Sequence, residues 1–397
     1  MAPSTTLCFT LFSLLGTRAL ALGKEASTTQ PRPYTINVDP SFIEETRLKA
    51  SKFRPSVDIR APAWSDGPPS ANVTALGKFW AEEYDWSAEQ ARINSNFSHY
   101  FTTLPPPGGK YTDALDLHFI HQRSQRKDAI PLLMLHGWPS TSLEWEKVIP
   151  GLVDPEDDSK PAFHIIAPDL PGYGFSPAPK APGLGPSEHG TVFASLMEQL
   201  GYDRYALYST DLGFVVAIRM VEEHTAHIIN HVTDFYLVFA TDEDNARYAA
   251  NKTTPEESAY ISSINGFFSS HAGYSAIHST LPLSLADALN DSPVGFLAWM
   301  WQLVFTVSDQ AYTPTELITR AFLLYLPGVY GNIRSYKELY SPAYFAPSKP
   351  STVPTSALQF GGVNGYPELA NFNYVVSSIL HSLPQISTNS SAASRVD

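Results

Sequence analysis

The stretch from Tyr205 to Met220 constrains the fold most strongly, because it has the pattern of an apolar strand, a sharp turn and an amphipathic helix. Asp211 occupies the turn, and the small residues Ser209 and Gly213 lie two positions to either side. Small neighbours let the strand and helix backbones approach closely, and Asp tolerates a left-handed turn conformation better than most residues. The pattern indicates a nucleophile elbow with Asp in place of the usual Ser. An ordinary strand-to-helix turn is the alternative that the stretch alone leaves open.

Short apolar runs alternate with helical patterns from residue 128 onward. The runs at 130–135 and 163–167 precede the elbow strand, and a helical pattern at 191–200 separates the second run from it. Such alternation predicts an α/β fold with a doubly wound, mostly parallel sheet. Ligands bind such sheets at the carboxyl ends of the strands, so the elbow and the loops after Leu135 and Ala167 are expected to open on one edge.

Changes in composition divide the 397 residues into successive regions. We expect a signal peptide at 1–21, a mainly helical N-terminal region at 22–127, the first part of the α/β core at 128–242, a helical cap insertion at 243–345, the last, incomplete core strands at 346–386 and a disordered tail at 387–397. The chain is 43% hydrophobic, which suits a large packed core.

The N-terminus predicts secretion. An apolar run from Leu7 to Leu15 is too short to span a bilayer and leads into the small-x-small cleavage pattern Ala19–Ala21. It lacks the usual basic residues, so an uncleaved anchor is the alternative. We expect no stable membrane anchor. Cys8 is the only cysteine and would be removed, which excludes disulfides.

Two further features bear on partners. Sequons that suit a secreted glycoprotein occur at Asn72, Asn96, Asn251, Asn290 and Asn389, the fourth disfavoured by a following proline. The net charge of −13, from 26 basic and 39 acidic residues, argues against a nucleic-acid partner. The sequence does not specify an oligomeric state.

The loop after the strand at 130–135 is His136-Gly-Trp-Pro139. A glycine-containing loop beside a nucleophile elbow is where an oxyanion hole forms. Its donors would be the backbone N–H groups of Trp138 and Leu212. A simple turn punctuated by Gly and Pro is the alternative, but the elbow that follows later in the chain makes it less favourable.

Three ordered motifs now indicate a family. His136–Pro139, the run Pro168-Asp-Leu-Pro-Gly-Tyr-Gly-Phe-Ser176 and the Asp211 elbow resemble the α/β-hydrolase-fold epoxide hydrolases of the microsomal type. The 34–127 region, with Phe79-Trp-Ala-Glu-Glu-Tyr-Asp-Trp86, resembles the N-terminal domain of that family. The resemblance extends over about residues 34–362.

The resemblance implies site residues and chemistry. In this family two cap tyrosines bind the epoxide oxygen, and the matching positions look like Tyr274 and Tyr336. The implied mechanism opens a hydrophobic epoxide to a vicinal diol through an alkyl ester on Asp211 and needs no cofactor. Another Asp-nucleophile hydrolase, such as a haloalkane dehalogenase, and a non-catalytic binding protein are the alternatives.

The C-terminal part departs from the family pattern. The family's Gly-Gly-His-Phe loop is absent, and His381 lies near its expected position in a different context. The family's acid position holds no carboxylate before Glu368, and Asp234 and Asp242, near the end of the sixth predicted strand, are the substitute acids. Phe214 occupies an elbow position that is usually small. An altered C-terminus and a catalytically impaired, repurposed protein are competing explanations.

Three histidines raise the question of a metal site. His224, His227 and His231 have helical spacing that would place them on one face. A helix that ends near His227, with His231 in the following strand, is the interpretation that we favour. We therefore predict no metal.

Overall fold

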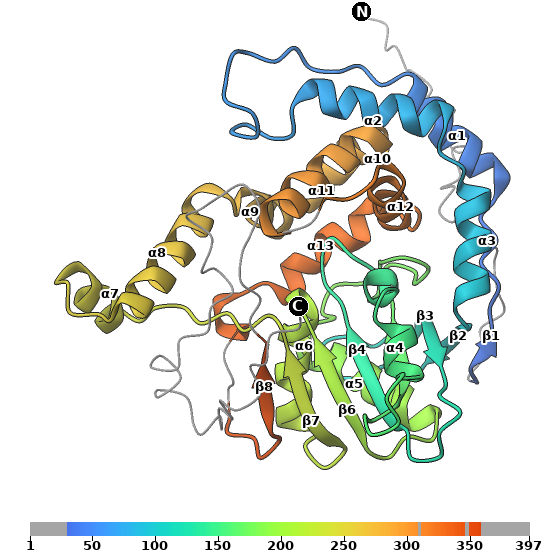
Figure 1. Ribbon diagram of the computed structural model, residues 1–397, viewed down its shortest axis with the longest axis vertical. Helices are drawn as coiled ribbons and strands as arrows, with labels where there is room; N and C mark the ends of the chain where they lie inside the picture. The colour runs from blue at the N-terminus through green and yellow to red at the C-terminus, as the bar shows by residue number, and fades with distance from the viewer. Residues whose placement is uncertain (1–29, 309–310, 346–348, 359–397) are drawn as a thin grey trace, which may run out of the picture.

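The computed structural model describes residues 30–308, 311–345 and 349–358. A mixed sheet of eight strands forms its centre, in agreement with the predicted α/β class (Figure 1). Its strands, in spatial order, are β1 (Arg32–Pro33), β2 (His99–Leu104), β3 (Leu115–Gln122), β5 (Phe163–Pro168), β4 (Ile130–Leu135), β6 (Tyr205–Ser209), β7 (Ile228–Thr233) and β8 (Thr355–Ala357). Strands β5, β4, β6, β7 and β8 are parallel neighbours, whereas β1, β2 and β3 continue the sheet in antiparallel fashion.

The helices form three groups along the chain. The N-terminal group is α1 (Pro40–Ser51), α2 (Ser70–Glu82) and α3 (Trp86–Asn96). The group interleaved with the strands is η1 (Ser142–Trp145), α4 (Ile149–Val153), α5 (Pro186–Gln199) and α6 (Asp211–Glu223). The group between β7 and β8 is α7 (Asp242–Ala249), α8 (Pro255–Ser270), α9 (Gly273–Thr280), α10 (Pro282–Asn290), α11 (Pro293–Val307), α12 (Pro314–Tyr325), α13 (Val329–Leu339) and η2 (Pro342–Tyr344).

Strand β4 shows how the sheet is buried on both faces. Successive side chains of a strand point to opposite faces, so its continuous apolar run contributes to two layers. Leu133 and Leu135 join the large core that includes α5 and α6, whereas Leu132 and Met134 join a smaller core with Trp145 and α4. The two-sided burial explains why this strand lacks the polar alternation of a half-exposed one.

Helices α10 to α13 lie above one end of the sheet, with α1 and α2 beyond them, whereas α3 runs beside the sheet near β1 and β2 (Figure 1). Helices α9 and α10 pack on α13, and α11 packs on α12. Helices α1 and α2 contact α11, and the ring of Phe42 in α1 meets Phe322 in α12 at 5.9 Å between centroids. The N-terminal segment therefore contacts the cap as well as the sheet.

Some sequence expectations need correction or lie outside the described residues. The N-terminal region is less uniformly helical than expected, because β2 pairs with β3 over six residues. Helix α3 is capped by Asp85, which accepts a hydrogen bond from Ala88 N. Outside the described residues lie the expected signal peptide, most of the region at 346–386 assigned to the last core strands, the sequon at Asn389, and both Glu368 and His381. None of the helices in the described ranges is long and apolar enough to cross a membrane.

A buried carboxylate joins the segments around the end of β5. Asp169 is fully buried and accepts hydrogen bonds from His118 Nδ1 on β3 at 2.7 Å, from Ser142 N at 2.7 Å and from Phe175 N at 2.9 Å. Burial would raise the pKa of Asp169, but His118, His136 and the Phe175 amide lower it below the ordinary value. The folded state therefore favours the ionised carboxylate.

We predict that Asp169→Asn lowers the free energy of unfolding by about 3–5 kcal/mol at pH 7, because it leaves a buried polar cluster without its charge. A carboxylate whose folded pKa is depressed stabilises above its unfolded pKa, and that stability is lost as the pH falls through the folded pKa. The difference from wild type should thus shrink below about pH 4. Urea unfolding at several pH values measures it, with the exposed Asp128→Asn as the control. Equal losses for the two variants would contradict the prediction.

Candidate functional site

The elbow lies where β6 meets α6. Strand β6 ends at Ser209 and α6 begins at Asp211, whose φ of 46° lies in the left-handed region. A Cβ at Gly213 would collide with the carbonyl oxygens of Leu135 and His136. The turn therefore requires the small residue that the sequence pattern contains, and it presents the Asp211 side chain at the start of a helix.

The loop after β4 contacts the Asp211 carboxylate. Trp138 N donates a hydrogen bond to Asp211 Oδ1 at 2.8 Å, and a Cβ at Gly137 would collide with both this carboxylate and Leu212 N. In the same loop, His136 Nε2 accepts a hydrogen bond from Leu170 N at 3.0 Å. This bond connects the loop after β4 with the loop after β5, the two loops that were predicted to open on one edge of the sheet.

Asp211 is electrostatically unusual. Burial raises its pKa to about 6, against hydrogen bonds from the backbone amides of Leu212 and Trp138 that lower it. The charges of Asp234 and Glu144 raise it further. A carboxylate held in this way is ionised at neutral pH but poorly hydrated, which suits a nucleophile.

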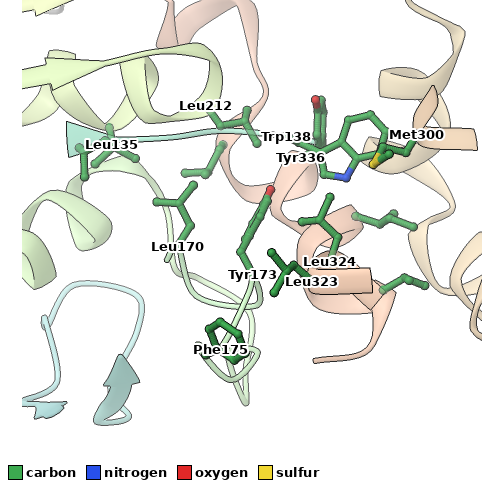
Figure 2. Close-up of a cluster of buried hydrophobic side chains, with 14 of the residues drawn as sticks. Leu135, Trp138, Leu170, Tyr173, Phe175, Leu212, Met300, Leu323, Leu324 and Tyr336 are labelled. Carbon is green, nitrogen blue, oxygen red and sulfur yellow. The ribbon is translucent and has the colours of Figure 1, made fainter. Parts of the chain in front are cut away.

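The two cap tyrosines lie next to Trp138. Tyr274 on α9 stacks on the indole with 5.3 Å between ring centroids, and Tyr336 on α13 meets it edge-on at 6.0 Å. Figure 2 shows Trp138 and Tyr336 within the buried cluster, which also contains Leu212. The tyrosine rings lie 5.7 Å apart. Burial raises the pKa of both phenols well above the ordinary value, and the charge of Asp211 adds to the rise, so both hydroxyls remain protonated donors.

Helix α13 is fixed to the core by buried hydrogen bonds. Trp138 Nε1 donates to Asn332 Oδ1 at 3.1 Å, and Asn332 Nδ2 donates to Leu324 O at 2.9 Å. Tyr173, from the loop after β5, contacts Ser335 Oγ at 2.6 Å through its hydroxyl. Asn332 is one helical turn before Tyr336, so these contacts orient the phenol.

The structure thus brings together Asp211, Trp138, Leu212, Tyr274 and Tyr336 from the sequence analysis. Sequence reasoning missed Asn332 and His278, a second buried polar residue of the cap. Helical spacing is the one signal that could have found them, because each lies four residues from a cap tyrosine on the same helix.

The remaining candidate residues have other surroundings. Asp234 follows β7, and burial raises its pKa, while hydrogen bonds with Thr210 and Tyr208 lower it. Phe214 is buried beside the aromatic rings of Phe235 and Tyr236, which accommodates its size.

The three histidines do not form a common cluster. His231 lies in β7, where Nε2 is 2.7 Å from Ser209 Oγ, and His227 Nδ1 contacts Asp203 O at 2.8 Å. His224 follows the last residue of α6. Within the described part of the chain, no three His, Cys, Asp or Glu side chains are grouped so as to bind a metal.

Comparisons with known proteins agree with this geometry. Residues 31–145 match the family "Epoxide hydrolase N terminus", and residues 130–251 match the family "alpha/beta hydrolase fold". The chain is 30% identical over 295 residues to a Stigmatella aurantiaca protein that is provisionally named an epoxide hydrolase. The alignment covers 74% of this chain and 64% of that protein. It thus spans slightly less than two thirds of that relative.

Two further matches cover more of the chain. Epoxide hydrolase 1 of Sus scrofa is 25% identical over 386 residues, covering 87% of this chain and 83% of that protein. The crystal structure of juvenile hormone epoxide hydrolase from the silkworm Bombyx mori superposes with a TM-score of 0.74 at 25% identity, covering 87% of each chain. The chain therefore has the α/β-hydrolase fold and is homologous to epoxide hydrolases.

We predict that Gly137→Ala lowers the free energy of unfolding by about 3 kcal/mol or more, because the added methyl group meets backbone as well as a carboxylate. Gly151→Ala is the matched control, since a Cβ there has open space in α4. It should leave stability equal or slightly higher. Thermal unfolding of both variants tests this, and a Gly137→Ala protein as stable as Gly151→Ala would refute it.

The pKa of Asp211 predicts a second change in stability. A carboxyl whose folded pKa is raised loses stability as the pH rises from its unfolded pKa, about 4, to its folded pKa, about 6. Asp211→Asn removes this cost, so the variant should gain on the order of 2 kcal/mol over wild type between pH 4 and pH 7.5. Urea unfolding at pH 4, 5.5 and 7.5 measures the gain. A difference that does not change with pH would contradict the assignment.

Proposed function

We propose that this chain, as a homologue of epoxide hydrolases with their N-terminal domain, opens hydrophobic epoxides to vicinal diols with Asp211 as the nucleophile. One observation carries the proposal. The phenol rings of Tyr274, which is partly buried, and of Tyr336, which is buried, both contact Trp138, whose amide holds the Asp211 carboxylate. A carboxylate that faces two neutral donors suits a substrate that must be attacked at carbon while its oxygen gains charge.

The first step forms an ester. One carboxylate oxygen of Asp211 attacks an epoxide carbon, and the electron pair of the broken C–O bond passes to the epoxide oxygen. A tyrosine phenol hydrogen-bonds this oxygen and gives it a proton, and water later restores the phenol. Because both phenols are un-ionised, they donate without repelling the developing alkoxide.

The second step releases the diol. A water oxygen attacks the carbonyl carbon of the Asp211 ester and loses a proton to a base, for which we propose His381. The backbone amides of Trp138 and Leu212 stabilise the resulting oxyanion. Collapse of the intermediate breaks the ester bond, and the proton of the new carboxylic acid passes to the leaving alkoxide, which gives the product its second hydroxyl and restores the carboxylate. The protonated base returns its proton through water to the phenolate. Water is the only co-reactant.

The lining of the site favours an apolar substrate. An aromatic cluster adjoins the elbow. The rings of Trp138, Tyr274 and Tyr336 contact one another, and Tyr340 lies 5.4 Å from Tyr336 between centroids. Desolvation of an aryl or alkyl substituent against such rings contributes binding free energy in proportion to the apolar area buried. The proposed substrates are therefore hydrophobic epoxides.

Styrene oxide tests the proposal without depending on turnover. We expect the wild-type chain either to gain the mass of one epoxide on Asp211, seen by intact and peptide mass spectrometry, or to release the diol. Asp211→Asn should do neither. The rate of alkylation should rise with pH to a plateau with a midpoint near 6, because only the ionised carboxylate attacks.

Two further variants separate this proposal from its alternatives. Tyr274→Phe and Tyr336→Phe should each slow alkylation by about 10- to 100-fold, since each removes a donor to a charged oxygen. A chain that is alkylated by 1-chlorobutane equally well with and without the phenols would favour a haloalkane dehalogenase. Absence of both label and diol in the folded wild-type chain would refute the hydrolase assignment and favour a binding protein.

A further inference from the structure

His278 lies among the site residues without a part in the mechanism above. It follows Tyr274 by one turn of α9, so both side chains project from the same face of the helix. Its side chain is 0% exposed. Its ring is 4.8 Å from Tyr336, 5.6 Å from Tyr274 and 4.7 Å from Trp138 between centroids. His278 therefore belongs to the same aromatic enclosure as the two phenols.

A hydrogen bond fixes which ring nitrogen of His278 carries the proton. Trp299 on α11 donates its indole N–H to His278 Nε2 at 2.9 Å. An indole nitrogen only donates, so Nε2 must accept, and the proton of the neutral ring lies on Nδ1. Burial lowers the pKa of His278 to about 3, which keeps the ring neutral at physiological pH. His278 is thus a neutral donor through Nδ1–H.

Two buried polar groups at this place lack a well-formed hydrogen bond. Within the described residues, His278 Nδ1 has no hydrogen-bond partner, and the Tyr336 hydroxyl has none of acceptable geometry, since it interacts only with the neighbouring Tyr274 hydroxyl. Buried donors are satisfied in the great majority of cases, and exceptions in a native structure call for a functional explanation. Here the two exceptions belong to rings in direct contact. An oxygen acceptor that enters the enclosure would satisfy both.

We propose that His278 is a third donor of the cap, whose Nδ1–H hydrogen-bonds the substrate oxygen together with Tyr274 and Tyr336. The proposal rests on the epoxide hydrolase function proposed above. An epoxide oxygen has two lone pairs, which two phenols can occupy. When the C–O bond breaks, its electron pair becomes a third lone pair on that oxygen, and the third donor then gains an acceptor. His278 keeps its proton throughout.

This timing gives a kinetic signature. A hydrogen bond that forms only as the ring opens stabilises the transition state and not the bound substrate. Loss of the donor should therefore lower the rate of alkylation at saturating epoxide and leave the half-saturating concentration nearly unchanged. A competing assignment directs Nδ1–H to the face of the Trp138 ring, which is perpendicular to His278. That arrangement would affect stability and leave alkylation unchanged.

Two substitutions distinguish the assignments. His278→Phe retains a ring and removes the donor, whereas His278→Gln supplies both an acceptor for Trp299 and an N–H donor. With styrene oxide under single-turnover conditions, we expect His278→Phe to alkylate about 10- to 100-fold more slowly, with half-saturation within about twofold of wild type. His278→Gln should recover to within about fivefold. His227→Phe changes an exposed histidine between α6 and β7, so it is the control and should match wild type.

The outcomes are separable. Alkylation of His278→Phe at the wild-type rate, or equal slowing in folded His278→Phe and His278→Gln, overturns the proposal while the hydrolase function stands. An unlabelled, inactive wild type overturns both. Should His278→Phe fail to fold, Trp299→Phe is the substitute variant. It removes the hydrogen bond that keeps the His278 proton on Nδ1, so alkylation is expected to slow several-fold. An unchanged rate in this variant would also overturn the proposal. Thermal unfolding of every variant identifies those that are folded.

Discussion

The hydrogen bond from Trp138 N to the Asp211 carboxylate is the contact on which the site depends, because it joins the loop after β4 to the elbow after β6. The contact is possible only because Gly137 and Gly213 carry no side chain where the two backbones approach. Parallel pairing of β4 with β6 sets the approach, since their carboxyl ends lie at one edge of the sheet. The site is therefore built first from backbone and only then from side chains.

Trp138 also connects this backbone arrangement to the cap. Its amide orients the carboxylate, its indole ring contacts Tyr274 and Tyr336, and its indole N–H binds Asn332 on α13. One residue thus sets the position of the negative group and of the two neutral donors opposite it. Burial disfavours the negative charge on Asp211, whereas the cap phenols offer hydrogen bonds to the substrate oxygen that would take up negative charge as the ring opens.

The features that could be predicted from the sequence are those that neighbouring residues determine. The turn at Asp211 needs small neighbours and a left-handed residue, and both signals lie within five positions. Tyr274 and Tyr336 could be selected only through the family resemblance, because in a chain with 20 tyrosines helical spacing does not show which side chains meet when they are 62 positions apart. Helical spacing from Tyr274 was the only signal for His278, and it could not show that His278 is hydrogen-bonded to Trp299 of another helix. Strand β2 was missed because its hydrogen bonds with β3 follow from tertiary pairing rather than from a clear period in its own sequence.

The N-terminal segment has a consequence for how such chains diverge. Its β2 is hydrogen-bonded into the sheet, while Phe42 packs on Phe322 of the cap and the Tyr84 hydroxyl lies 2.9 Å from Thr319 Oγ1. Residues from the first and last thirds of the chain thus share one interface. A cap exchanged between homologues would lose its counterpart unless α1 and α2 were exchanged with it. A substitution on one side of this interface therefore requires a compatible residue on the other, although the two segments lie far apart in the sequence.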